Sequence, residues 1–134
     1  MSMKILLVED DVLLAKSTAK LIEKIGNYPV EIAVEPAQIF AKCQSGEIDV
    51  VLMDINLPGA KWEGEDVSGA DLSKILKSQP QTSHIPIVLV TAYAMKSQRQ
   101  ALLEVSGADE LFTKPITDYK ALIALIEQIS TTKK

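Results

Sequence analysis

The 134-residue sequence lacks the marks of several large protein classes. It contains one cysteine, Cys43, so an internal disulfide is excluded. No apolar stretch approaches the roughly 20 residues that a membrane-spanning helix needs. No positively charged leader with a long apolar core begins the chain. We therefore expect a cytoplasmic location and no membrane partner.

The sequence also lacks a strong excess of charge of one sign. A net charge of -4 and a pI near 5.0 argue against a general affinity for nucleic acid, so no direct nucleic-acid contact is expected. Apolar residues make up 47% of the chain, which is enough for a packed core. We find no linker, repeat or low-complexity segment. We expect a single domain over residues 1–134, without an output domain.

What the sequence does contain is a strict alternation of strand and helix patterns. Five short apolar runs are typical of strands, and they lie at residues 5–8, 30–34, 49–53, 87–90 and 111–112. Segments with apolar residues at helical spacing follow each run, and in the first of them Leu14, Thr18, Leu21, Ile22 and Ile25 recur at this spacing. The pattern predicts an α/β fold: a doubly wound, flavodoxin-like, five-stranded parallel sheet in the order 2-1-3-4-5 with helices on both faces.

Carboxylates directly follow two of the predicted strands. Glu9 and Asp10 follow the first strand, and Asp54 follows the third. In the expected order these strands flank the switch point of the sheet, so the three carboxylates meet in one crevice. Clustered carboxylates repel each other unless a cation lies among them, and hard oxygen ligands favour magnesium. Thr91 and Lys114 enter the same crevice from the fourth and fifth strands.

This set of side chains has a coherent chemical interpretation. Asp54 is a candidate carboxylate nucleophile towards a phosphoryl group. A magnesium ion held by Asp10 would neutralise both the nucleophile and the incoming phosphoryl oxygens. Lys114 would add a second positive charge, and the Thr91 hydroxyl would add a hydrogen-bond donor.

Four motifs, in this order and spacing, resemble the response-regulator receiver domain of two-component signalling over essentially the whole chain. They are Leu7-Val8-Glu9-Asp10-Asp11, Met53-Asp54-Ile55-Asn56-Leu57-Pro58, Val90-Thr91-Ala92 and Thr113-Lys114-Pro115.

The resemblance implies a role for each residue of the site. Asp54 would be the phosphoacceptor, and Asp10 would bind the magnesium directly. Glu9 would bind it through water, and the backbone carbonyl of Asn56 would complete the protein ligands. The resemblance further implies that Thr91 and Lys114 contact the phosphoryl group, and that the bond before Pro115 is cis.

The resemblance also implies a place in signalling. A sensor histidine kinase or histidine phosphotransfer protein would phosphorylate Asp54. The face of the fourth helix, fifth strand and fifth helix would then bind a downstream protein target. Such a chain is not an enzyme, although it assists its own magnesium-dependent phosphotransfer and autodephosphorylation. The alternative is an interaction module that keeps the receiver fold and signals without phosphorylation.

Enzymes built on similar sheets fit the sequence poorly. A haloacid-dehalogenase-type phosphatase needs a second acid two residues after its nucleophile, where this chain has Asn56. A flavodoxin-like protein needs a phosphate-cradling loop after the first strand, where this chain has three acids. Of the remaining polar residues, Asp11 is expected to cap the first helix, Cys43 to lie in the core and His84 to lie in a surface loop.

Two departures from the family pattern stand out. About seven extra residues lie between Pro58-Gly59 and Gly69, and they include the lone Trp62. They would cover the site, shape a partner surface or extend into solvent. The position three before Lys114 usually carries an aromatic residue whose rotation accompanies signalling, and here it is Leu111. The neighbouring Phe112 is predicted to point to the opposite face of the sheet.

Overall fold

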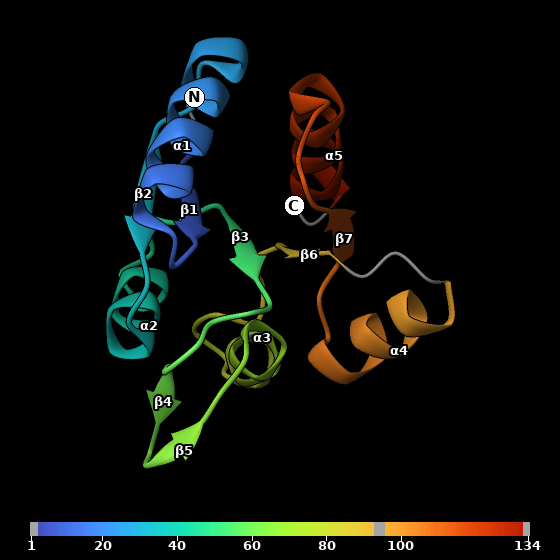
Figure 1. Cartoon of the computed structure of the whole chain (residues 1–134). Helices are drawn as coiled ribbons and strands as arrows, with labels where there is room; N and C mark the ends of the chain where they lie inside the picture. The colour runs from blue at the N-terminus through green and yellow to red at the C-terminus, as the bar shows by residue number, and fades with distance from the viewer. Residues whose placement is uncertain (1–2, 93–95, 133–134) are drawn as a thin grey trace.

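The computed structural model describes residues 3–92 and 96–132, and it is built around a five-stranded parallel sheet (Figure 1). Its strands in spatial order are β2 (Val30–Ala33), β1 (Ile5–Val8), β3 (Val50–Asp54), β6 (Ile87–Thr91) and β7 (Glu110–Thr113). Counted along the chain without the small hairpin described below, this is the predicted order 2-1-3-4-5. The predicted fold class is confirmed, and each strand end differs from the predicted one by at most one residue.

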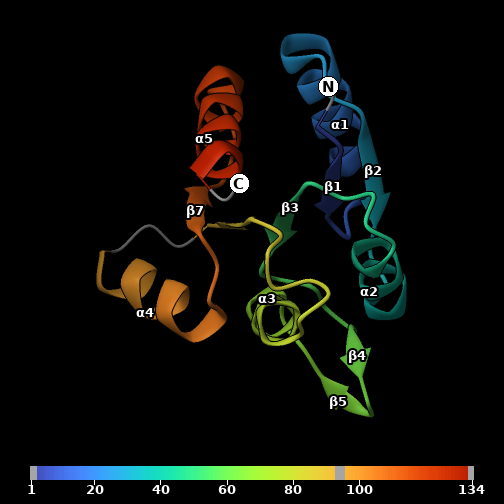
Figure 2. The same cartoon turned by 180° about the vertical axis from the view of Figure 1, so that it is seen from behind.

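Within the described residues, five helices cover the two faces of the sheet (Figures 1 and 2). α1 (Val12–Gly26) and α5 (Tyr119–Thr132) lie on one face and pack against each other. α2 (Pro36–Gln44), α3 (Gly69–Ser78) and α4 (Lys96–Ser106) lie on the other. No helix in the described part of the chain is long and apolar enough to cross a bilayer.

The central strands supply side chains to a core on each face. In β1, Leu6 and Val8 pack on the α2–α3 side, whereas Ile5 and Leu7 pack on the α1–α5 side. Successive side chains of a strand point to opposite faces, so a strand buried on both sides is apolar throughout. This explains why the apolar runs predicted the sheet. Cys43 is 1% exposed in the α2-side core, as expected, and burial raises the pKa of its thiol to about 11.

The predicted first helix is confirmed as α1, and its buried face is formed largely by small side chains. Its buried residues are Ala15, Thr18, Ala19 and Ile22. Three of the apolar residues that recur at helical spacing are exposed by between 38% and 44%, namely Leu14, Leu21 and Ile25. Alanines place α1 against the sheet, and small side chains let a helix approach closely.

The extra residues after Gly59 form a small antiparallel hairpin of β4 (Lys61–Trp62) and β5 (Glu65–Asp66). Its two turn residues, Glu63 and Gly64, both have positive φ, as a two-residue type I′ turn requires. Trp62 packs against Phe40 of α2, with ring centroids 4.4 Å apart. The hairpin therefore rests on the α2 side of the molecule rather than extending freely into solvent (Figure 1).

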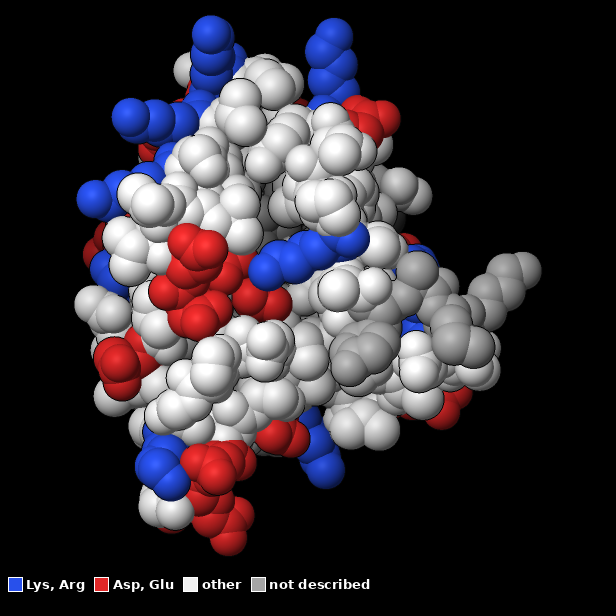
Figure 3. Space-filling model, viewed as in Figure 1, with Lys and Arg blue, Asp and Glu red and all other residues white. Residues whose placement is uncertain are grey.

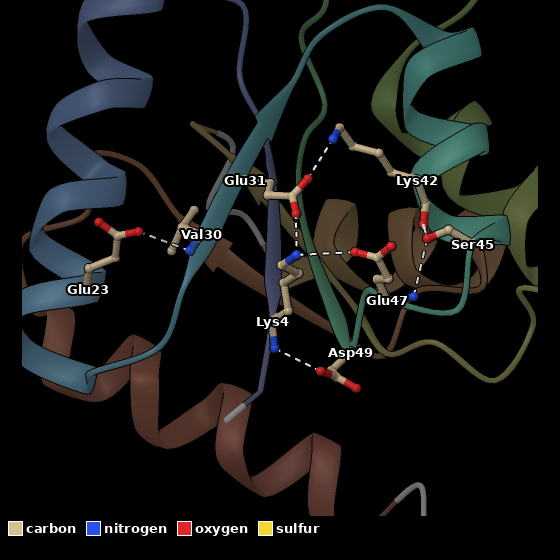
Figure 4. A network of polar contacts seen from close by, with 8 residues as sticks. All are labelled: Lys4, Glu23, Val30, Glu31, Lys42, Ser45, Glu47 and Asp49. Atoms are coloured by element: carbon tan, nitrogen blue, oxygen red, sulfur yellow. Dashed lines mark hydrogen bonds and ion pairs between the residues drawn. The ribbon is translucent and has the colours of Figure 1, made fainter. Parts of the chain in front are cut away.

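Ion pairs tie the opposite, amino-terminal edge of the sheet together (Figure 4). The Glu31 carboxylate of β2 lies 2.5 Å from the ammonium groups of both Lys4 and Lys42. The Lys4 ammonium also contacts Glu47 at 3.3 Å, and its backbone N–H donates to the Asp49 carboxylate at 2.8 Å. The hydrogen bonds from Lys4 and then Lys42 lower the pKa of Glu31 to about 2.

Candidate functional site

Three carboxylates meet at the carboxyl edge of the sheet, as the strand order predicted. Asp54 is the last residue of β3, and Glu9 and Asp10 follow the neighbouring β1. Each of the three offers an oxygen within 4.8 Å of the others. Glu9 and Asp54 are only 6% and 4% exposed, whereas Asp10 is half-buried. Figure 3 shows acidic side chains gathered on this face of the molecule with a basic side chain beside them.

Lys114 partly neutralises this acid cluster. Its ammonium lies 2.9 Å from the Glu9 carboxylate and 2.9 Å from the Asp54 carboxylate. Burial alone would lower the pKa of Lys114, but the hydrogen bonds to the two carboxylates outweigh it and raise this pKa. The pKa of Asp10 is also raised, first by burial and then by the neighbouring Glu9. Negative charge at Asp10 is therefore not fully compensated, and the donor set fits a hard cation such as magnesium.

Backbone hydrogen bonds position the acidic side chains. The Asp11 N–H donates to Glu9 Oε2 at 3.1 Å, while the Asp11 side chain caps α1 by accepting from Leu14, as predicted. The Asn56 N–H donates to Asp54 Oδ1 at 3.3 Å. These contacts restrain the two carboxylates through the same loops that follow β1 and β3.

Gly69 at the start of α3 is a residue whose importance sequence reasoning missed. A Cβ at this position would lie 2.0 Å from the backbone oxygen of Asp54. The Gly69 N–H donates to the Ile55 carbonyl at 2.9 Å. The absence of a side chain therefore lets α3 begin directly against the end of β3. The sequence signal was a glycine at a helix start, which does not by itself reveal its neighbour.

The other predicted residues lie where the motifs indicated. Thr91 ends β6 and is 4% exposed, and its carbonyl accepts from the Lys114 N–H at 2.8 Å. The Lys114–Pro115 bond is cis, as expected. Leu111 is buried on the α2–α3 side of the sheet, and Phe112 packs on the α1–α5 side. Residues 93–95, between Ala92 and α4, lie outside the described residues.

A cavity of about 310 Å³ adjoins the acid cluster between α1 and the segment that leads into α5. Glu9, Asp54 and Lys114 form its charged side. Its other walls are mostly apolar: Leu7, Val8, Leu14, Thr18, Val90, Ala92, Pro115, Ile116 and Tyr119. The first turn of α1 beside it exposes Val12 by 60% and Leu13 by 80%. An apolar surface therefore borders the acidic site.

Comparisons with known proteins agree with this geometry. Residues 5–127 match the family described as the response regulator receiver domain. The aerobic respiration control sensor protein ArcB of Escherichia coli is 33% identical over 98% of this chain, which spans only 16% of ArcB. The polar-differentiation response regulator DivK of Brucella ovis is 32% identical, and the match covers 87% of this chain and 88% of DivK.

The fold is likewise found among solved structures. The receiver domain of sensor histidine kinase PA1611 from Pseudomonas aeruginosa superimposes with a TM-score of 0.79 and 22% identity, covering 98% of this chain and 99% of that domain. That structure has a magnesium ion coordinated in the active-site cleft. The family match spans nearly the whole chain and includes every residue of the acid cluster. This chain belongs to the response regulator receiver domain family, whose members are signalling proteins rather than conventional enzymes.

Proposed function

We propose that this chain is a phosphoacceptor that takes a phosphoryl group from a sensor histidine kinase or histidine phosphotransfer protein onto Asp54. The supporting observation is the convergence of Glu9, Asp10 and Asp54 at one sheet edge, with Lys114 bridging two of them. Grouped, partly buried carboxylates destabilise a fold unless a cation compensates them. A site of this kind is therefore better explained by phosphoryl chemistry than by packing.

In the transfer step, an Asp54 carboxylate oxygen forms a bond to phosphorus as the bond from phosphorus to the donor's histidine nitrogen breaks. The electron pair of that bond returns to the imidazole ring. Lys114 lies within 2.9 Å of the Asp54 carboxylate, where its charge would balance the phosphoryl oxygens. Thr91 would donate its hydroxyl hydrogen to one of these oxygens. The burial of Asp54 limits access of water to the product.

Asp10 would bind a magnesium ion directly, Glu9 would bind it through water, and the backbone carbonyl of Asn56 would be a further ligand. The magnesium coordinated in the PA1611 receiver domain supports this assignment by analogy. The bound ion would supply positive charge to the carboxylates and the phosphoryl oxygens.

The apolar surface beside the site would accept the phosphoryl donor. Leu14 of α1 lines the cavity that reaches Asp54, and the preceding Val12 and Leu13 are largely exposed. Neighbouring exposed apolar side chains beside a polar site are a candidate interaction surface. We further propose that the α4–β7–α5 face binds the downstream target.

Mass spectrometry after incubation with acetyl phosphate tests the proposal. We expect the wild-type protein to gain one phosphoryl group when magnesium is present and none when it is chelated. Asp54→Asn should gain none, and Asp10→Asn should react much more slowly. Asp11→Asn is the matched control, because it removes a neighbouring acid while asparagine still caps α1.

Undiminished phosphorylation of the Asp54→Asn protein would contradict the proposal. Failure of the wild-type protein to react under any magnesium concentration would favour the phosphorylation-independent interaction module. Leu111 is the observation that favours the phosphorylation-independent module, because this buried leucine has no aromatic ring that could rotate on phosphorylation.

A further inference from the structure

The hairpin after β3 grows directly out of the loop that follows the proposed phosphoacceptor. At its base, the Gly69 N–H donates to the Ile55 carbonyl at 2.9 Å. Further out, the Val67 N–H donates to the Ala60 carbonyl at 3.0 Å. The ladder of β4 and β5 continues from there. The two sides of the insertion are therefore joined along their length, from the end of β3 to the tip.

Trp62 anchors this hairpin to the body of the protein. Its ring is tilted by 55° to that of Phe40, with centroids 4.4 Å apart. Phe40 is itself 4% exposed in the core on the α2 side of the sheet. The ion pair between Lys61 and Asp66 joins β4 to β5 within the hairpin, is largely exposed at 62% and 83%, and adds little. Ala60 and Val67 at the base of the hairpin pack against the same core as Phe40, and Trp62 adds the aromatic contact further out.

The loop between these two attachments carries Asn56. Before it, the Ile55 N–H donates to the Val90 carbonyl of β6 at 3.1 Å. After it, Leu57 is 5% exposed in the same core as Phe40. The Leu57 carbonyl accepts from the Ala60 N–H, which links the loop to the hairpin at 3.1 Å. The backbone around Asn56 is thus restrained on one side by the sheet and on the other by the hairpin.

We propose that Trp62 is a positioning residue for the magnesium site, and that it acts through the hairpin on the Asn56 loop. This inference rests on the proposed function. With Trp62 docked on Phe40, the loop holds the Asn56 carbonyl in place as a ligand. Without the anchor, the loop samples other conformations and binding must restore the ordered one, which weakens magnesium affinity. Asp54 itself stays in β3, so its reactivity at saturating magnesium is retained.

Magnesium titrations followed by calorimetry test this inference. We expect Trp62→Ala to weaken magnesium binding by roughly tenfold, the lower end of effects seen when outer support of metal ligands is removed. Trp62→Phe should keep nearly wild-type affinity, since it restores a ring against Phe40. Lys61→Ala is the matched control from the same strand and should bind magnesium normally. Phosphorylation of Trp62→Ala by acetyl phosphate should be slow at low magnesium and should reach the wild-type rate at saturation.

Two results would overturn the inference. One is unchanged magnesium affinity in Trp62→Ala, and the other is a rate defect that saturating magnesium does not restore, as general loss of structure would give. Trp62→Leu, which keeps apolar volume without an aromatic ring, serves in the same test if the alanine variant does not fold. A wild-type protein that binds no magnesium would overturn the proposed function as well. If the wild-type protein binds magnesium and the Trp62 variants bind it equally well, the positioning role of Trp62 alone would be overturned.

Discussion

At the scale of single residues, the absence of a side chain at Gly69 lets the start of α3 lie directly against the end of β3. Gly69 has no strained backbone requirement, in contrast to Gly46, whose φ is +85°. Its constraint is contact, because a Cβ would overlap the backbone of Asp54 and Ile55. Two glycines in one chain thus illustrate two separate physical reasons for the same residue type.

Gly69→Ala should therefore destabilise the fold and disturb the acid cluster together. We expect a loss of about 3 kcal/mol in the free energy of unfolding, because backbone atoms must move to relieve the overlap. Gly46→Ala, where nothing lies within 4 Å, should cost only the strain of a positive φ, about 1 kcal/mol. Denaturant unfolding compares the two variants. Equal losses, or normal magnesium binding by Gly69→Ala, would show that α3 is not held as tightly as the structure indicates.

Asp10 offers a second test at this scale. Its carboxylate lies within 4.8 Å of two others, and its raised pKa indicates that its negative charge is unfavourable there. Asp10→Asn should raise the melting temperature when magnesium is absent and should remove most of the effect of added magnesium. For the wild-type protein, magnesium well above its dissociation constant should stabilise by about 1 kcal/mol or more. A wild-type melting curve that does not respond up to about ten millimolar magnesium would count against a working site.

At the scale of elements, local patterns predicted most of the sheet and the site, and contact between distant segments decided the rest. The apolar runs identified all five main strands, of which β1, β3 and β6 are buried at every position while the edge strands β2 and β7 are only partly buried. The strand ends then placed Asp54, Thr91 and Lys114. The hairpin was not predicted. Each of its strands is two residues long, and it depends on Trp62 reaching Phe40, which is 22 positions earlier in the chain. The Glu63-Gly64 turn was its one local signal.

A partly buried ion pair joins α3, β6 and the segment before β7. Lys77 of α3 donates to the Asp109 carboxylate at 2.8 Å and to the Ile85 carbonyl at 2.7 Å. The same carboxylate accepts from the Ile87 N–H of β6 at 2.8 Å. The two side chains are only 14% and 10% exposed. Such a pair fixes α3 against β6 and the segment before β7.

Asp109→Ala should destabilise the protein by about 3 kcal/mol, because it leaves the Lys77 ammonium and the Ile87 N–H with fewer acceptors in a low-dielectric setting. The double variant Lys77→Met/Asp109→Ala should lose less free energy of unfolding than the two single variants lose in sum. A double-mutant cycle measured by chemical unfolding checks this. Additive losses would mean that the pair contributes no coupling.

At the scale of the whole molecule, charge is divided between the two edges of the sheet. The carboxyl edge holds the acid cluster, whereas the amino-terminal edge holds a balanced network around Glu31 (Figure 4). The acid cluster is only partly paired, through Lys114, whereas the Glu31 carboxylate is paired with two lysines. This contrast separates the edge suited to chemistry from the edge that stabilises the fold.

The paired edge predicts a specific acid sensitivity. Lys4 and Lys42 hold the pKa of Glu31 at about 2, below its ordinary value of 4.5. A lowered pKa in the folded state contributes stability that is present above pH 4.5 and is lost as the pH falls towards 2. Glu31→Gln should therefore be less stable than wild type at neutral pH, with the difference shrinking across this range. A difference that stays constant from pH 6 to about 2 would contradict the lowered pKa of Glu31.

The central claim is that Asp54 receives the phosphoryl group, and locating the modified residue tests it most directly. Borohydride reduces an aspartyl phosphate to homoserine, which marks the acceptor permanently. After treatment with acetyl phosphate and magnesium, we expect homoserine at position 54, within the tryptic peptide of residues 43–61. This peptide also contains Glu47 and Asp49 as internal controls. Reduction at another carboxylate, or a mark that persists at the same level without magnesium, would contradict the assignment of Asp54.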